Sequence, residues 1–571
     1  MDDSQRVSYL PLALALLTTA LLQAVLVARM PTISADGIIF TNVARDLVDN
    51  PREAMREHDQ HPGFPAAMLA ATRTVQALGY RHEPESWMVG GIAVAVVCGL
   101  AAVGVVWLLT RDLYGVGVAN LAAFIFAVLP IPRALAADAQ SDMPHALLYL
   151  TAVWLAARGL SSGRIAPLVG AGLATGTAYL IRPEGLEVLL VALPLIAWRA
   201  MRGAWPWRRA ALGGLAMAGA AILIAAPYPL LAGKITSKQV PFAKGKSAPT
   251  YIAQQAEVPK PAPPTVEPAS PSTPSPQSPP IDQTAVTSAN ATPQPAAPAP
   301  PEPSPPVPSP PKIEHRYTAG LVFKLAGKAL VALIVAICQG FKFVFIPLYL
   351  VGQWAMIRRQ PDWTRIGFMW CLASLHMAVL IGVFIMSGYI ANRHVLPLVG
   401  LAMPFTALGM VYAADVLGPL LRLRPRTLVF ATMLACLAVV LPYCVRPYNR
   451  EFLPVIAATE WIQQHAPANA GVVCNSPYVG YYGTRPTTIL GPQAVSLDAA
   501  LAQGRQGVRF DYVVLHVNAH DYRPEWLSQV ESRYRQIADY PDPTGDPRGR
   551  RVLVFEAIDA QARRQAGGPR S

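Results

Sequence analysis

The chain has 571 residues, of which 53% are hydrophobic and only 14% are charged. This composition excludes an ordinary soluble domain, in which about a quarter of the residues are charged. The net charge of +13 would favour nucleic-acid binding in a soluble chain. Here the arginines lie in short loops between apolar runs, as membrane topology requires. We therefore interpret the chain as a polytopic, mainly α-helical membrane protein without a nucleic-acid partner.

The first apolar run, Val7–Val27, is longer than the hydrophobic part of a signal peptide and is followed by no small-residue cleavage site. It predicts a first span that is retained. The loop after it, 29–86, collects ionisable residues, including Asp36 before Gly37 and His61 before Pro62. Charge beside a membrane costs free energy unless it is solvated or used. We therefore predict that this loop carries the reactive groups.

Further apolar runs predict a total of about eleven spans. Residues 319–338 are not counted among them, because Lys324 and Lys328 lie one turn apart and favour an interfacial helix. Arginines in alternate short loops place the N-terminus in the cytoplasm and the 29–86 loop outside. The predicted spans after the first are 87–109, 117–131, 142–159, 165–181, 184–198, 210–230, 339–357, 366–387, 395–416 and 427–444.

A linker over 256–312 with roughly twenty prolines divides the membrane region into 1–255 and 313–450. Its composition favours extended polyproline II, so we predict a solvated spacer. Residues 451–571 have the pattern of a small extracytoplasmic α/β domain without a GxGxxG or P-loop motif. The predicted helices there are 451–465, 496–503 and 524–533, and the predicted strands are 471–474, 511–517 and 552–555.

The six cysteines do not indicate a metal centre, because four of them lie inside apolar runs and no CxxC spacing occurs. Cys444 and Cys474 fall in or next to segments that we place outside the membrane. A disulfide between them stays open at this point.

The order of the polar motifs resembles the GT-C superfamily of membrane glycosyltransferases. The resemblance is to the branch of dolichyl-phosphate-mannose protein mannosyltransferases and lipid A aminoarabinose transferases. It covers about residues 1–450 apart from the linker. The matching motifs are Asp36-Gly37, His61-Pro62, Ser141-Asp142, Arg182-Pro183-Glu184-Gly185 and Asn392-Arg393-His394. Many members carry Asp-Glu where this chain has Asp36-Gly37, so a mechanism with two carboxylates at this position is in doubt.

The resemblance implies transfer of a sugar, with inversion, from a polyprenyl-phosphate donor to a hydroxyl acceptor outside the membrane. Such a hydroxyl needs a base, for which Asp36 is the candidate, with Asp142 as a second acidic residue. The departing phosphate needs positive charge. Arg182, Arg393, Lys234 and Lys238 are candidates to hold it, and His61 and Glu184 complete the substrate-binding set. No cofactor is indicated, a divalent metal stays open, and the plasma membrane is the expected location.

Each of these residues also has a structural interpretation. Asp36 and Asp142 could cap helices, and His61 could be a turn residue. Arg182 and Arg393 could extend towards lipid headgroups, and the lysines from Lys234 to Lys246 could attract anionic lipid. His145 and His376 lie inside predicted spans and are better explained by partners on neighbouring helices than as metal ligands. Tyr478, Tyr481 and Tyr482 could stack on a sugar or simply belong to the domain core.

Two other functions compete with sugar transfer. A transporter or flippase would favour internal repeats and ionisable residues at mid-membrane, and this sequence has neither. A scaffold that displays the C-terminal domain on a stalk is weakened because the proline linker lies between spans and does not precede that domain.

Overall fold

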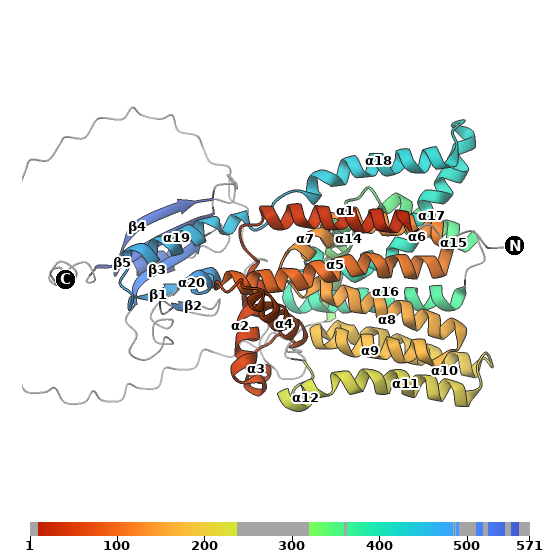
Figure 1. Ribbon diagram of the computed structural model, residues 1–571, viewed down its shortest axis with the longest axis horizontal. Helices are drawn as coiled ribbons and strands as arrows, with labels where there is room; N and C mark the ends of the chain where they lie inside the picture. Colours follow the sequence, from red (N-terminus) through yellow and green to blue (C-terminus); the bar gives the residue numbers. More distant parts are fainter. Residues whose placement is uncertain are drawn as a thin grey trace, which may run out of the picture.

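A computed structural model describes residues 9–236, 319–358, 362–483, 485, 487–489, 510–517, 524–542 and 550–558. The proline linker, Lys238 and the helix predicted at 496–503 lie outside the described residues. In Figure 1 a long helical bundle lies beside a smaller α/β domain, and α1 (Leu10–Arg29) begins at the end of the bundle far from that domain. We name the end of the bundle next to the α/β domain the domain end.

The bundle is built from the apolar segments that the sequence predicts. Seven helices of the described chain are long and apolar enough to cross a membrane, and a bent helix pair raises this number to eight. The chain is therefore an integral membrane protein, although this test does not reproduce all eleven predicted spans. The bundle helices are α1 (Leu10–Arg29), α5 (Glu85–Tyr114), α6 (Val116–Val128), α7 (Pro130–Ala137), α8 (Asp142–Ser162), α9 (Ile165–Ile181), α10 (Glu187–Met201), α11 (Trp207–Ala225), α15 (Ile346–Arg358), α16 (Trp363–Ser387), α17 (Leu396–Leu420) and α18 (Pro425–Cys444).

The run predicted as one span at 117–131 is broken into α6 and α7, which meet at an angle of 58°. Pro130 opens α7 and disfavours helical geometry at Leu129, whose backbone is extended. The bend directs the chain into the buried turn around Asp138. The run predicted at 184–198 likewise begins with a short 3₁₀ helix, η1 (Pro183–Leu186), before α10.

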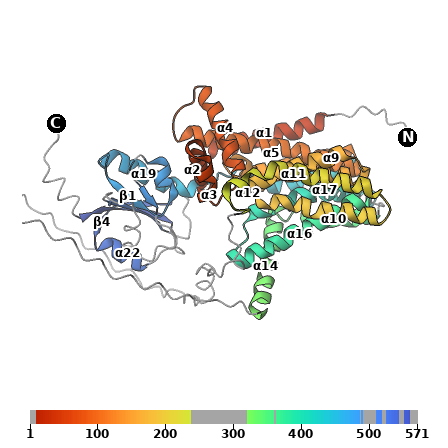
Figure 2. The same cartoon turned by 90° about the horizontal axis from the view of Figure 1, so that it is seen from below.

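The segment after the linker differs from the prediction. Helix α14 (Ala319–Gly340) is followed by a bend at 341–345, so the span predicted at 339–357 is the shorter helix α15. Residues Phe323–Gly340 are long and apolar enough to cross a membrane. In Figure 2 α14 stands at a steep angle to α5 and α9, and the interfacial helix stays a prediction. It packs against α16 and against η3 (Asn392–Val395).

Four short helices cover the domain end of the bundle. They are α2 (Ala35–Asp49), α3 (Pro51–Glu57), α4 (Gly63–Ala77) and α12 (Pro227–Ala232). The Oγ of Ser34 accepts a hydrogen bond from the Gly37 amide, so a serine cap begins α2 just before Asp36. The 29–86 loop is therefore a set of packed helices with few irregular residues.

The C-terminal domain has a five-stranded sheet in the order β2-β1-β3-β5-β4. Strand β1 pairs in parallel with β2 and β3, whereas β5 is antiparallel to β3 and β4. Sequence analysis missed β2, β4 and the short helix α20. The elements are η4 (Arg450–Phe452), α19 (Leu453–His465), β1 (Gly471–Cys474), α20 (Pro477–Tyr482), β2 (Thr487–Ile489), β3 (Phe510–Val517), α22 (Pro524–Glu531), β4 (Tyr534–Pro541) and β5 (Arg551–Ala557).

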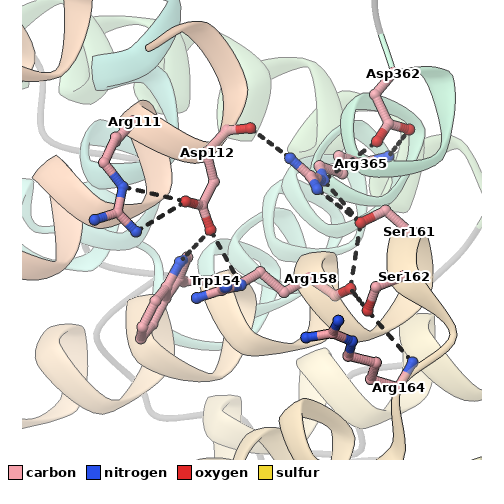
Figure 3. Close-up of polar contacts among 9 residues, drawn as sticks. All are labelled: Arg111, Asp112, Trp154, Arg158, Ser161, Ser162, Arg164, Asp362 and Arg365. Atoms are coloured by element: carbon pink, nitrogen blue, oxygen red, sulfur yellow. Dashed lines mark hydrogen bonds and ion pairs between the residues drawn. The ribbon is translucent and has the colours of Figure 1, made fainter. Parts of the chain in front are cut away.

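Ion pairs and hydrogen bonds tie α5, α8 and α16 together at the end of the bundle away from the α/β domain. Figure 3 shows Arg111 and Arg158 converging on the Asp112 carboxylate, at 3.1 and 3.3 Å. Arg365 donates hydrogen bonds to the Oγ of Ser161, at 2.8 and 2.9 Å. These arginines belong to the set that predicts the cytoplasmic side, and they also have a structural role between helices.

Candidate active site

A cleft at the domain end brings together residues from the motifs that are far apart in sequence. It encloses about 30 Å³, which is room for no more than a few waters. A sugar can enter only if the cleft widens. It is lined by Asp142, His145, Arg182, Glu184, His376, Leu380, Val383, Arg393, His394, Leu396 and Pro397.

Asp36 and Arg393 form an ion pair at the edge of this cleft. Asp36 lies in the first turn of α2, and Arg393 lies in η3 directly before α17. The Asp36 side chain remains 38% exposed, so a hydroxyl group can reach it from solvent. Asp36 is therefore accessible enough to act as a base, and its charge is held by a cation that could also bind phosphate.

Asp142 and Arg182 form a second ion pair deeper in the cleft. The Arg182 Nη2 lies 2.8 Å from the Asp142 Oδ1, and its Nε donates to the Oγ of Ser141 at 3.1 Å. The Asp142 side chain is only 2% exposed. This burial makes Asp142 a poor base for an incoming acceptor. It is better suited to orient Arg182, which lines the cleft.

A buried histidine and glutamate hold η3 in place. His376 Nδ1 lies 2.8 Å from Glu187 Oε2, and the same oxygen accepts a hydrogen bond from the Tyr149 hydroxyl at 2.9 Å. His376 Nε2 lies 3.1 Å from the His394 carbonyl oxygen, which can only accept, so Nε2 carries a proton. The Glu187–His376 pair therefore connects α10 and α16 to His394, the residue next to Arg393.

Sequence analysis did not select Glu187. The available signal was a carboxylate inside an apolar run together with a histidine inside another, since buried ionisable groups need partners. The prediction that His376 is satisfied by a neighbouring helix agrees with the Glu187 contact. His145 lines the cleft.

Asp138 was also missed, although it fixes the start of α2. Its carboxylate accepts hydrogen bonds from the amides of Ser34 and Ala139 and from Gln140 Nε2, at 3.0, 2.8 and 2.7 Å. Burial raises the pKa of Asp138 above its ordinary value, and these hydrogen bonds oppose that rise. Asp138 thus joins the turn after α7 to the segment that presents Asp36.

Gly37, where many GT-C members have a second carboxylate, packs closely against this turn. A Cβ atom built at Gly37 would lie 3.0 Å from the Ala139 carbonyl oxygen and 3.2 Å from the Ile33 side chain. The close approach explains why a residue without a side chain follows Asp36.

His61 and Lys234 lie apart from the residues that line the cleft. His61 is buried, its Nδ1 lies 2.8 Å from the Tyr179 carbonyl oxygen, and its ring packs on Tyr179 and Tyr228. Lys234 Nζ donates to the carbonyls of Arg56 and His58, at 2.7 and 2.8 Å. In this conformation both residues hold the helices of the domain end together. The predicted role of Lys238 falls outside the described residues.

Tyrosines of the C-terminal domain dock on the chain just before Asp36. The Tyr478 hydroxyl donates to the Ile33 carbonyl at 3.0 Å, and the Tyr482 and Thr32 hydroxyls lie 2.6 Å apart. The Tyr481 hydroxyl donates to the Pro84 carbonyl at 3.2 Å. Burial raises the pKa of Tyr478 and Tyr481, so both stay protonated donors at neutral pH. The domain therefore supports the reactive segment, and sugar stacking is not needed to explain these rings.

The structure also bears on a metal site near Asp36 and Asp142 and on a disulfide between Cys444 and Cys474. In the described ranges no group of three histidine, cysteine or acidic side chains is arranged to hold a metal ion, and Asp36 and Asp142 are each paired with an arginine. Cys444 and Cys474 are free thiols, and each donates to a backbone carbonyl, that of Val128 or Ser476.

Comparison with known proteins gives one match to a protein-family model. Residues 84–227 match the family model of the dolichyl-phosphate-mannose-protein mannosyltransferases. No curated protein sequence matches the chain significantly.

Solved structures match over nearly the whole chain. ArnT from Cupriavidus metallidurans bound to undecaprenyl phosphate is 14% identical with a TM-score of 0.55, and covers 98% of this chain and 99% of its own. Its apo state gives a TM-score of 0.53 at 14% identity, with 98% of each chain covered. The archaeal oligosaccharyltransferase AglB from Archaeoglobus fulgidus is 12% identical with a TM-score of 0.52, covering 97% of this chain and 74% of AglB. The chain therefore has the fold of the GT-C membrane glycosyltransferases, as its motifs predict.

Proposed function

We propose that the protein transfers a sugar from a polyprenyl-phosphate donor to a hydroxyl acceptor, with inversion at the anomeric carbon. The observation that carries this proposal is a cleft lined by two arginines, Arg182 and Arg393, with one accessible carboxylate, Asp36, paired with Arg393 at its edge. The GT-C fold supports it, and the structures it resembles include an ArnT bound to undecaprenyl phosphate.

In this proposal Asp36 accepts the proton of the acceptor hydroxyl as its oxygen attacks the anomeric carbon. The bond between that carbon and the phosphate oxygen breaks, and the lipid phosphate leaves with the bonding electron pair. Arg393 and Arg182 stabilise the charge that develops on this phosphate, since guanidinium groups bind phosphate oxygens in pairs. Asp142 orients Arg182 through their ion pair.

The Asp36–Arg393 ion pair is then the resting form of the site. A base and a leaving group lie on opposite sides of the anomeric carbon in an inverting reaction, so the sugar has to separate Asp36 from the phosphate. Donor binding would draw Arg393 towards the phosphate and release the Asp36 carboxylate. The small volume of the cleft fits this requirement.

The reaction is assigned to the outer face of the membrane on the arginine distribution, with the plasma membrane as location. The acceptor is a hydroxyl of a protein, lipid or glycan. We leave Lys234 out of the phosphate site, because its ammonium donates hydrogen bonds to two backbone carbonyls.

The test is release of free polyprenyl phosphate by detergent-purified protein from a panel of polyprenyl-phosphate sugars, with crude membrane extract as acceptor. Detergent micelles have no compartments, so a transporter would release none. Release with at least one donor supports transfer and identifies the sugar. Folded protein that releases polyprenyl phosphate from none of the donors contradicts the proposal.

A further inference from the structure

Arg133 on α7 is a fully buried arginine that the proposed reaction does not use. Among the residues that the structure describes, its Nε, Nη1 and Nη2 have no hydrogen-bond partner. Arginine keeps its charge in proteins, and an isolated buried charge is costly unless an anion compensates it. The surroundings of Arg133 therefore call for an anion that the described chain does not supply.

Two further cations lie near Arg133, beside the C-terminal end of α18: Lys342 in the bend at 341–345 and Arg446 just after α18. Arg133 and Lys342 both act electrostatically on Cys444, and Arg446 acts on Lys342. No carboxylate is among the groups that act on Arg133 or Lys342 in the described chain. Helix α7 packs against α18, α1 and α5. We name Arg133, Lys342 and Arg446 the lateral cation cluster.

The chain presents Lys342 through an unusual backbone bend. Lys342 and Phe343 both have left-handed backbone angles, with φ of 49° and 60°. Non-glycine residues seldom adopt this conformation, and it is often found at binding sites. The bend holds the Lys342 Nζ 4.3 Å from the centre of the Tyr443 ring. Arg446 is exposed, as are the apolar side chain of Phe343 and the ring of Tyr443, so the cluster opens on the outer surface of the bundle.

We propose that Lys342 and Arg446 bind the phosphate of a membrane lipid, and that Arg133 supplies buried positive charge behind it. A phosphate satisfies cations that have no carboxylate nearby, and the exposed aromatic rings beside them suit a position at the membrane interface. Positive residues are depleted from the outer side of membrane proteins, where we place this cluster. Their grouping there favours a binding role.

Two lipids carry this chemistry, an anionic bilayer phospholipid and a polyprenyl phosphate. Only the second rests on the proposed function. Binding to purified full-length protein is measured by native mass spectrometry with dioleoyl phosphatidylglycerol and with undecaprenyl phosphate, and dioleoylglycerol serves as a probe without phosphate. The test variant is Lys342→Gln/Arg446→Gln. Its matched control is Arg424→Gln/Arg426→Gln, which removes two exposed cations from the other end of α18.

The double variant should bind one or both phosphate lipids about 25-fold more weakly than wild type, since each of the two cations near a lipid phosphate contributes on the order of a fivefold change. The control should bind like wild type. Weakening with undecaprenyl phosphate alone identifies the polyprenyl lipid, and weakening with phosphatidylglycerol alone identifies the bilayer lipid. Equal binding of both phosphate lipids by the double variant and wild type would overturn the proposal.

Arg133→Met tests the buried charge separately. Removing an uncompensated charge should leave the melting temperature of lipid-free protein equal to or above that of wild type, and should reduce the rise that phosphate lipid produces. A lower melting temperature with an unchanged lipid-induced rise would assign Arg133 a purely structural role and contradict this part. All of these are binding measurements, so their failure is distinct from a failure of sugar transfer.

Discussion

Asp36 and Arg393 form an ion pair although 357 residues separate them in the chain. One opens the first helix after the first span, and the other lies in the short helix before α17. This contact joins the N-terminal and C-terminal halves of the membrane region at one cleft. In our proposal the same contact sets the resting state, because donor phosphate must replace Asp36 as the partner of Arg393.

Replacing Arg393 should therefore affect both binding and turnover of the donor. Arg393→Gln should lower kcat/KM for the donor by about a hundredfold, since it removes charge from the leaving phosphate. Arg393→Lys should have a kcat/KM between those of Arg393→Gln and wild type, because lysine keeps the charge and loses the paired hydrogen-bond geometry. Initial rates of phosphate release against donor concentration measure this. Arg426→Gln, an exposed arginine outside the cleft, is the control, and an Arg393→Gln enzyme as active as this control would contradict the assignment.

His376 should act by positioning Arg393. His376→Phe removes the hydrogen bond to the His394 carbonyl and leaves Glu187 with one partner fewer. We expect a folded protein whose kcat falls by about tenfold or more, because small displacements of catalytic groups reduce rates strongly. His376→Gln can still donate to that carbonyl and should recover part of the rate. If both variants had the same kcat as wild type, the Glu187–His376 pair would have no part in positioning.

Gly37 should tolerate no side chain. Gly37→Ala places a Cβ atom 3.0 Å from the Ala139 carbonyl oxygen, so we expect a loss of stability of about 1–3 kcal/mol and lower turnover. Gly219→Ala on α11 is the matched control, because a Cβ there meets nothing within 4 Å. Thermal unfolding of the two variants in the same detergent measures the difference. Equal melting temperatures would show that α2 can move away from the turn without cost.

Asp138 predicts a pH dependence of stability. Its pKa in the folded protein is raised above the ordinary value of 3.8, because the carboxyl is buried. Because the folded state binds this proton more tightly than the unfolded state does, the protein loses stability as the pH rises above the unfolded pKa. Asp138→Asn lacks this loss, so its melting temperature relative to wild type should increase from about pH 4 to about pH 8. A difference that is constant over this range would contradict the raised pKa.

Much of the fold could be predicted because membrane spans are long and apolar. The motif order also identified Asp36, Asp142, Arg182, Glu184 and Arg393, and all except Asp36 line the cleft, while Asp36 pairs with Arg393 at its edge. Side-chain partners across distant helices could not be predicted. Nothing in the local sequence shows that Glu187 faces His376, or that Lys234 reaches the carbonyls at the C-terminal end of α3, since these contacts depend on how the helices pack.

The bend at 341–345 was also beyond sequence reasoning. The apolar run continues through it, so hydropathy predicts one boundary at 339, whereas the backbone turns at Lys342 and Phe343. Similarly, strand β4 carries alternating exposed residues with little hydrophobic signal and was missed, although its partner β5 was predicted from a run of buried apolar residues.

The most direct test of the central claim is the rate of polyprenyl phosphate release by Asp36→Asn, compared with Asp46→Asn as a control on the same helix. Asp46 lies almost three turns further along α2 and pairs with His58. If Asp36 is the base, its variant should stay folded and lose turnover by a factor on the order of a hundred or more, while the control keeps the wild-type rate. Wild-type turnover by folded Asp36→Asn protein would contradict the account.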